Sequence, residues 1–309
     1  MFQGKEYIYK VFKEQSFSKA AKEMYISQPS LSASVRRVEE KVGAPLFDRS
    51  TKPLSLTECG EKYIEAVEKM MAAEEEFREY ISDWEGLKTG TLTVGGSSLF
   101  SALVLPSLIR QFQERFPAVT IRLVEENSAV LREMLQDGRI DLMLDNCARQ
   151  PDMFDDKLYR EEHLLLAVPA VNPVNEKLRE YEITREQLLA PDGMPPAVPM
   201  DEFRGEQFIL LRPANDTRER AEAVLKANGL KPSVLFELDQ QMTAFHVTCS
   251  GAGISFVSDT LILASAQMGD VCFYRLPEKY SRRMIRFFWK KGRYVSRIMR
   301  EFLAICDQS

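Results

Sequence analysis

The sequence predicts an α/β protein that begins with a small all-α module. Three observations predict it: short amphipathic segments within residues 1–60, a Pro-free helical segment at about residues 58–85, and alternating strand and helix patterns from residue 91. A chain of 309 residues, with 45% hydrophobic and 28% charged residues, has ordinary globular composition and room for two or three domains.

Composition argues against several other classes of protein. No apolar run approaches the roughly 18 residues of a membrane span, and the first residues, MFQGKEYIYK, lack the apolar core of a secretory signal. The five cysteines are far apart without a C-x-x-C pair, and there are only two histidines. We therefore expect a cytoplasmic protein with reduced thiols, no metal site, no cofactor and no membrane partner.

The charge is unevenly distributed along the chain. Residues 1–60 carry ten Lys or Arg against seven Asp or Glu, whereas the whole chain has a net charge of −5. A positive module on an acidic body suits a DNA reader whose body stays off the DNA. Charge alone leaves chance as an equal explanation.

Residues 27–43 predict a helix with an unusual polar face. Ser27 or Gln28 can cap free N–H groups at its start, and Pro29 is tolerated in a first turn. One side is apolar: Leu31, Val35, Val38 and Val42. The other side is small and basic: Pro29, Ser32, Ala33 and Arg36, with Arg37 beside them. Such a face suits a helix whose N-terminal end enters the major groove of DNA.

Five short motifs follow one another between residues 17 and 60. They are FSKAA (17–21), SQPSLS (27–32), RVEEKVG (37–43), LFDR (46–49) and LTECG (56–60). Together they resemble the winged helix-turn-helix of the LysR-type transcriptional regulators. Within it we expect helices at residues 5–15 and 19–25, a stop of the recognition helix at residues 43–45, and a wing tip at residues 50–53.

The resemblance implies a set of DNA-binding residues in the recognition helix and the wing. They are Ser27, Gln28, Pro29, Ser30, Ser32, Ala33, Arg36, Arg49 and Lys52. Many family members carry Arg or another polar residue where Ala33 stands, and Ala offers only a methyl contact. For Arg37 and Lys41, a solvated face or an ion pair with Glu40 explains the residues at least as well.

The long helical segment from about Glu58 to Glu85 carries a heptad stripe. Its members are Tyr63, Ala66, Met70, Ala73, Phe77, Tyr80 and Trp84. The stripe could pack on its own domain, but pairing with a second copy fits better because a winged helix usually reads symmetric half-sites as a dimer. The resemblance implies that this segment is the dimerisation helix. The residues GLKTG, from Gly86 to Gly90, predict a hinge into a new domain.

A pattern of strands and helices follows the hinge. We expect strands at residues 91–94, 119–125, 140–144, 164–168, 208–211, 234–238, 254–257, 271–276 and 283–289. Helices are expected at residues 100–116, 130–136, 218–228, 240–250 and 294–306. The first three strands and their connecting helices form βαβαβ, which predicts a parallel sheet covered on its faces.

Three local motifs extend the resemblance over nearly the whole chain: residues 106–117, 137–142 and 251–255. They resemble the regulatory half of the LysR family, which is built like a periplasmic binding protein with two lobes. The implied domains are a DNA-binding domain at 1–58, a linker helix and hinge at 59–88, and a regulatory domain at 89–309. Its lobe I would span about 91–163 and 268–309, and lobe II about 164–267.

This chain departs from the family in two places. Ser258 stands where the family often has Pro. The Pro-rich stretch between Asn175 and Met200 is longer than the usual connection, and a surface excursion is favoured over a cover for a cleft.

Polar residues follow the expected strands where an effector cleft would lie. They are Ser97, Ser98, Asn127, Ser128, Asp145, Asn146, Asn215, Thr217 and Gln240, with Gln241 next to the last. Singly, each is more often a helix cap than a ligand contact. Asp145 would suit a ligand with an amine or hydroxyl group, and nearby Cys147 is either an inert buried thiol or, less commonly, a redox sensor.

The resemblance implies a transcriptional regulator whose regulatory domain binds a small-molecule effector and alters promoter binding. The implied partners are double-stranded promoter DNA, the effector, RNA polymerase and a second copy in a homodimer, with dimers pairing into a homotetramer. An enzyme is the second hypothesis, but G-x-S-x-G, Walker and H-E-x-x-H motifs are absent, so no catalytic residue is expected. An exported solute-binding protein is the third, and the missing export signal opposes it.

Overall fold

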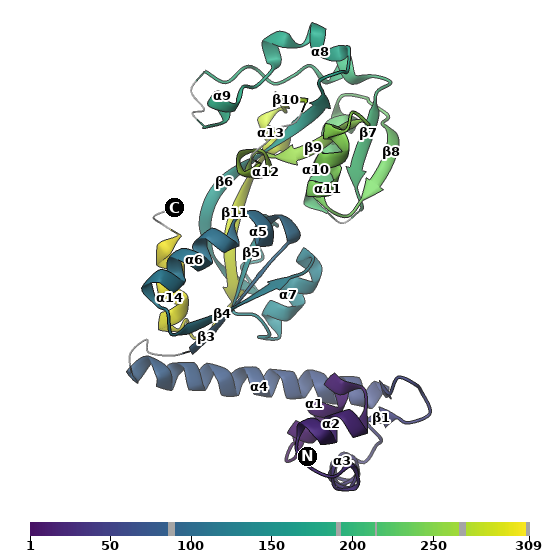
Figure 1. The fold of residues 1–309 in the computed structure, drawn as a ribbon, viewed down its shortest axis with the longest axis vertical. Helices are drawn as coiled ribbons and strands as arrows, with labels where there is room; N and C mark the ends of the chain where they lie inside the picture. Colours follow the sequence, from purple (N-terminus) through teal and green to yellow (C-terminus); the bar gives the residue numbers. More distant parts are fainter. Residues whose placement is uncertain (86–89, 190–192, 214, 266–269, 307–309) are drawn as a thin grey trace. The chain divides into compact units, whose positions relative to one another are not determined.

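The computed structural model describes residues 1–85, 90–189, 193–213, 215–265 and 270–306, apart from a few side chains within helices. The chain divides into two compact units, Met1–Glu85 with Gln136–Arg139, and Gly86–Leu135 with Ile140–Ser309. Figure 1 labels the elements of both. Among the described residues, no helix is long and apolar enough to cross a membrane. Most of the predicted hinge, residues 86–89, lies outside the description.

The N-terminal unit contains the predicted helices and a small hairpin. Its elements are α1 (Lys5–Glu14), α2 (Phe17–Glu23), α3 (Gln28–Val42), β1 (Phe47–Asp48), β2 (Ser55–Leu56) and α4 (Glu58–Glu85). α2 begins two residues earlier than predicted because the Ser16 hydroxyl accepts from the Lys19 N–H and caps the helix there. Gly43 ends α3 with a φ of 87°, a conformation that glycine adopts without strain.

A single apolar core holds this unit together. Leu31, Val35 and Val38 of α3 are almost fully buried, as the periodicity predicted. They pack with Ile8 and Val11 of α1 in the same cluster. Burial of one face of α3 therefore leaves its opposite face to the solvent.

The predicted stripe on α4 divides into two parts with different environments. Tyr63 is 5% exposed and belongs to the core of the N-terminal unit, where its ring stacks on Phe2 with centroids 5.1 Å apart. Phe77 is 65% exposed and Tyr80 is 40% exposed. The side chain of Trp84 lies outside the described residues. The N-terminal end of the stripe thus packs within its own unit, whereas Phe77 and Tyr80 further along are exposed to solvent.

Lobe I of the C-terminal unit is built on a three-stranded parallel sheet. Its strands and helices are β3 (Gly90–Gly96), α5 (Ser98–Leu103), α6 (Leu105–Arg115), β4 (Val119–Glu125), α7 (Ser128–Gln136), β5 (Leu142–Asp145) and the C-terminal α14 (Arg297–Ile305). β3 pairs parallel with both β4 and β5, as the βαβαβ pattern predicted. Successive residues of β5 enter two different clusters, Leu142 and Leu144 on one face and Met143 on the other. Helices therefore cover both faces of the sheet.

The single helix predicted over residues 100–116 is wrong, because the structure has two helices there. α5 ends at Leu103 and α6 begins at Leu105, with Val104 between them. Pro106 lies in the first turn of α6. Its ring occupies the place of an N–H and disfavours a continuous helix through the preceding turn, but it is well suited to a new helix start.

The strands of lobe II continue the sheet of lobe I, because two long strands join the two lobes within one nine-stranded sheet (Figure 1). The elements of lobe II are β7 (Gln207–Leu211), α10 (Asp216–Ala227), β8 (Ser233–Leu238), α11 (Gln241–Cys249), β9 (Ile254–Ser258), α12 (Asp259–Ala264), β10 (Val271–Arg275) and α13 (Glu278–Ser281). The connecting strands are β6 (Phe154–Pro169) and β11 (Arg282–Lys290), which pair antiparallel. Because β10 pairs with residues 165–169 of β6, the chain returns to lobe I at β11, later than the predicted residue 268.

The Pro-rich stretch forms short helices against lobe II. They are α8 (Val174–Lys177), η1 (Arg179–Tyr181), α9 (Arg185–Leu189) and η2 (Met200–Phe203). Val198, Met200 and Phe203 are at most 3% exposed and join the lobe II core. Ser258, at the second departure from the family, caps α12 by accepting from the Leu261 N–H at 3.2 Å. Its own N–H donates to Gln241 at 3.2 Å, a bond that Pro could not make.

Candidate functional sites

The start of α3 presents a row of exposed polar side chains. The Ser27 hydroxyl accepts from the Ser30 N–H at 3.3 Å, which fixes the first turn. The Gln28 amide donates to the Ser32 hydroxyl at 3.2 Å. Ala33 and Arg36 follow on the exposed side of the helix. The predicted groove residues of α3 therefore lie together on one surface, with Ser32 partly shielded.

The two predicted wing residues differ in how firmly they are held. The Arg49 guanidinium lies 3.1 Å from Glu39 and 5.1 Å from the centroid of the Phe17 ring. Glu39 in turn accepts from the Leu46 N–H at 2.9 Å, so Arg49 is tied to the base of the hairpin. Its side chain is still 40% exposed. Lys52 is exposed in the loop between β1 and β2.

Sequence reasoning missed one exposed residue next to this surface. Tyr25 is 96% exposed in the turn between α2 and α3, with a φ of 55°. Such a large aromatic side chain fully in solvent at a turn in a left-handed conformation is uncommon. No sequence signal distinguished it from a buried Tyr, because its place after Met24 fits a helical apolar pattern equally well.

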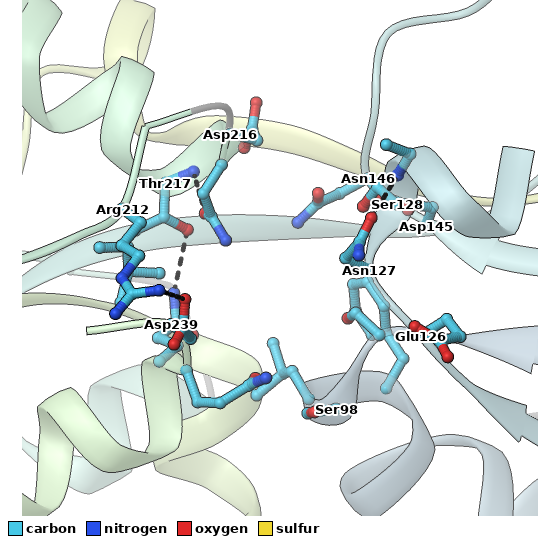
Figure 2. A pocket seen from close by; sticks show the side chains of 18 of the residues that line it. Ser98, Glu126, Asn127, Ser128, Asp145, Asn146, Arg212, Asp216, Thr217 and Asp239 are labelled. Carbon is cyan, nitrogen blue, oxygen red and sulfur yellow. Dashed lines mark hydrogen bonds and ion pairs between the residues drawn. The ribbon is translucent and has the colours of Figure 1, made fainter. Parts of the chain in front are cut away.

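A cavity of about 560 Å³ lies between the two lobes. All nine predicted effector residues line it, together with Gln241. Figure 2 shows Ser98, Asn127, Ser128, Asp145 and Asn146 on one wall and Arg212, Asp216, Thr217 and Asp239 facing them. The walls meet here because the carboxyl ends of β3, β4 and β5 in lobe I face those of β7 and β8 in lobe II.

Two of the nine residues act as helix caps, which was the alternative considered for each of them. The Asn127 side chain accepts from the N–H groups of Ala129 and Val130, both at 3.1 Å. The Asn215 side chain accepts from the Thr217 N–H at 2.9 Å. Capping uses only the amide oxygens, so the amide nitrogens of both residues remain potential donors.

Asp145 is the most deeply buried acid on the cavity wall. It is 2% exposed, and its Oδ1 accepts from the N–H groups of Asn146 at 2.7 Å and Cys147 at 3.0 Å. Its Oδ2 has no hydrogen-bond partner among the described residues. Burial raises the pKa of Asp145, although the nearby Ser128 hydroxyl, the two N–H groups and Arg132 each favour the carboxylate.

A buried ion-pair network lies at the back of the cavity on the strands that join the lobes. Arg283 of β11 lies opposite Glu162 of β6, with Nε 2.6 Å from a carboxylate oxygen but poorly aligned for a hydrogen bond. Arg283 also donates to Asp216 and Thr217, both at 3.0 Å. The Asn146 amide donates to Glu162 at 3.2 Å. One network therefore connects polar residues of both lobes.

Comparison with known families decides the identity of the chain. A model of the bacterial regulatory helix-turn-helix proteins of the lysR family matches residues 3–61. A model of the LysR substrate binding domain matches residues 85–309. The chain belongs to the LysR family. It is a DNA-binding transcriptional regulator with a substrate-binding domain.

Individual LysR-type relatives match almost the full length of the chain. A Bacillus subtilis protein, the uncharacterized HTH-type transcriptional regulator YybE, is 28% identical, and the match covers 96% of this chain and 94% of that protein. A full-length OxyR variant from Pseudomonas aeruginosa is similar in structure, with a TM-score of 0.72, 21% identity and coverage of 99% and 93%. The structure of full-length CbnR with its target DNA is also similar, with a TM-score of 0.68 and 19% identity. The match covers 100% of this chain and 99% of that chain. The predicted fold class is confirmed.

Several lining residues of this LysR-type cavity were not predicted. The charged ones are Glu125, Glu126, Arg212, Asp216, Asp239 and Arg283. The acids directly adjoin predicted residues, since Glu126 precedes Asn127 and Asp216 lies between Asn215 and Thr217. Including one or two more residues at each strand end would have predicted these acids. Arg283 lies in mid-strand, and nothing in its neighbourhood in the sequence points to the cavity.

Cys147 has the properties of an inert thiol. It does not line the cavity, and burial followed by the charge of Asp145 raises its pKa to about 12. At neutral pH such a group is almost entirely protonated and therefore a poor nucleophile. His163 lies between two acids: its Nδ1 is 3.4 Å from Asp259 and its Nε2 is 3.1 Å from Glu161.

Proposed function

We propose that this LysR-family protein is a homodimeric promoter-binding regulator that responds to a small-molecule effector held between its lobes. The observation that carries the proposal is the convergence of nine strand-end residues on one cavity, in the same chain as an exposed polar face on α3. The cavity of about 560 Å³ falls in the usual range for small-molecule sites, roughly 300–1,000 Å³.

In this proposal the exposed face of α3 reads DNA in the major groove. Gln28, Ser30 and Ser32 supply hydrogen bonds to base edges, and Ala33 supplies a methyl contact. Arg36 contacts guanine or phosphate, and Arg49 and Lys52 contact phosphate from the hairpin. Ser27 and Pro29 set the start of the helix.

The effector acts by shifting the balance between two arrangements of the lobes. β6 and β11 are the paired connections between them, and the Arg283–Glu162 pair lies where these strands pass the cavity. A ligand that contacts both walls stabilises one arrangement over the other, and the difference in its affinity for the two sets the size of the response.

The exposed aromatic residues of α4 suit a dimer interface. Phe77 and Tyr80 stack with centroids 6.4 Å apart, and a wet aromatic pair gains stability when a second copy covers it. Residues 59–88 thus serve as a linker helix and hinge between a reader at 1–58 and a regulatory domain at 89–309. Pairing of dimers into a tetramer, contact with RNA polymerase, a cytoplasmic location and the lack of any enzymatic activity complete the proposal.

DNA binding is tested with purified full-length protein at matched salt. Promoter DNA with a palindromic site should be bound much more tightly than random DNA of equal length. Arg36→Ala should weaken binding to that site by roughly tenfold, because one contact to a base or phosphate is lost. Arg110→Ala, which removes an exposed Arg of lobe I, is the matched control and should leave binding unchanged. Equal affinity for palindromic and random DNA would contradict the proposal.

The interface is tested by sedimentation of full-length protein. Phe77→Glu places a charge within the proposed interface and should shift the equilibrium toward monomer. Glu65→Lys changes the charge at an exposed position of the same helix away from the stripe and should leave the mass unchanged. If both variants keep the wild-type mass, the interface is not on this stripe.

A further inference from the structure

The cavity wall is strongly acidic for a small-molecule site. Five carboxylates line it: Glu125, Glu126, Asp145, Asp216 and Asp239. Of the described residues on the wall, only Arg212 and Arg283 are basic. Low-dielectric walls with charges of one sign concentrate ions of the opposite sign. The charge balance therefore favours a positively charged occupant.

The two arginines on the wall add no net positive charge to it. Arg212 lies 3.3 Å from Asp239, and the two opposite charges of this pair cancel. Arg283, only 4% exposed, is held between Glu162 and Asp216. Each basic group among the described lining residues thus already faces an acid of the protein.

Asp145 is an independent reason to expect a hydrogen-bond donor in the cavity. Its Oδ1 accepts from two backbone N–H groups and the Ser128 hydroxyl near the carboxylate also favours its charged form, whereas Oδ2 is buried without a hydrogen-bond partner in the part of the chain that the structure describes. Leaving an ionised oxygen in this state is costly, and buried charges are normally paired. Since Asp145 lines the cavity, a donor placed in the cavity can reach the one oxygen of this carboxylate that is left unsatisfied.

Helix N-termini at the cavity are the features that would favour an anion instead. α5, α7, α10 and α11 all begin there, and a helix N-terminus attracts negative charge. However, Asn127 and Asn215 already accept from first-turn N–H groups of α7 and α10. The Ser98 hydroxyl at the same wall donates to Glu125. Several N–H and hydroxyl groups that could donate to an anion thus already donate to acceptors of the protein itself.

We propose that the effector is an organic cation, a small molecule whose protonated amine donates a hydrogen bond to Asp145 Oδ2. An ammonium group has three donors, and the side-chain oxygens of Ser128 and Asn146 beside Asp145 in Figure 2 suit the other two. The carboxylates of the wall supply the remaining attraction. This inference rests on the proposed function, in which the cavity is the effector site.

The experiment compares ligands of one size and different charge on the full-length protein. Three probes share a four-carbon chain and differ in charge. Putrescine carries two positive charges, 1,4-butanediol carries none, and succinate carries two negative charges. A wider set of primary amines and of carboxylates of similar size is measured beside them, by melting temperature and by calorimetric titration. We expect the amines, and not the neutral or anionic compounds, to raise the melting temperature.

Two variants locate the site of binding. Asp145→Asn keeps the shape and removes the charge, and we expect the affinity of the best amine to fall by roughly 10- to 100-fold, the usual effect of losing a charge-assisted hydrogen bond. Asp155→Asn removes an exposed acid of lobe I outside the cavity and should leave the affinity unchanged. Circular dichroism checks that both variants fold, and the wild-type ranking of the compounds stands without either variant.

The outcomes separate this inference from the proposed function. Preferential binding of carboxylates, or equal binding of amines to Asp145→Asn and wild type, overturns the cationic effector while leaving an effector site in place. No response to any amine, from protein that still binds DNA, also overturns it. If an amine binds with the expected Asp145 dependence but leaves promoter binding unchanged, the inference about the cavity stands and the proposed response to effector fails.

Discussion

Replacing Arg283 by Met should strongly destabilise the C-terminal unit. Met fills much of the same space but has no charge, so Glu162 would be left as a buried, unpaired carboxylate. Glu162 is fully buried at 0% exposure, and the Arg283 side chain is 2% exposed. Because water cannot reach this carboxylate, its desolvation is not relieved by solvent.

The expected loss follows from the depth of the pair. Breaking a buried ion pair by removing one partner costs about 3–5 kcal/mol. For domains of 150–250 residues, each kcal/mol lowers the melting temperature by about 2–4 °C, so we expect a fall of roughly 6–20 °C. The double variant Glu162→Met/Arg283→Met should recover most of this loss, since replacing both charges by apolar groups is often nearly neutral.

The assay follows urea unfolding by fluorescence in a Trp84→Phe background. The chain has two Trp residues, so Trp289 of β11 then reports alone on the strand that carries Arg283. The matched control is Arg282→Met at the adjacent position. Arg282 is 47% exposed and pairs with Glu161 at 2.8 Å, and solvent screens such an exposed pair, so its loss should change the stability little.

Two results would refute the reasoning. If Arg283→Met loses no more stability than Arg282→Met, burial does not determine the strength of these pairs. If the double variant is as unstable as the single one, the cost comes from lost packing and hydrogen bonds to Asp216 and Thr217, and not from the charge left on Glu162.

Three further predictions concern single ionisable groups. Because burial raises the pKa of Asp145, its charge opposes folding above the usual carboxyl pKa; Asp145→Asn should therefore stabilise the ligand-free protein by about 1–3 kcal/mol at pH 7, a gain that disappears at acidic pH in melting scans. Because the pKa of Cys147 is about 12, mass spectrometry should find it unalkylated by iodoacetamide at pH 7.5 in the folded protein and alkylated after denaturation; rapid native labelling would contradict this. A hydrogen bond to Asp259 raises the pKa of His163, so the contribution of this His to folding stability is present below its unfolded pKa and is lost as pH rises through its folded pKa. His163→Gln should therefore lower the stability by less than about 1 kcal/mol at pH 5.5 and leave it unchanged at pH 8.5. An equal loss at both pH values would refute this prediction.

Much of the local structure could be predicted from the sequence. The long helix α4 has the predicted bounds, Glu58 to Glu85, and β4 has the predicted bounds, Val119 to Glu125. Both segments have short-range signals, a heptad stripe in the first and alternation in the second. The break at Val104 was missed although Pro106 marks it, because the apolar period continues on both sides of the break.

The candidate site was predictable where it depends on chain order along parallel strands. In a βαβ unit each strand ends at the same edge of its sheet, so polar residues such as Ser97, Asn127 and Asp145 must converge. Their role in binding an effector stays a prediction. The acids beside these residues could have been predicted by including one or two more residues at each strand end.

The sequence by itself determined the family motifs, the buried face of α3 and the strand ends around the cavity, because each of these depends on residues close together in the chain. Tertiary structure alone decided the pairing of Arg283 with Glu162, since these residues are far apart in sequence and meet only through the register of β6 and β11. It also decided that both arginines of the cavity lie beside acids and that, among the described residues, one oxygen of Asp145 is left without a hydrogen-bond partner. Charge in a cavity depends on which groups face each other, and only the folded chain fixes that.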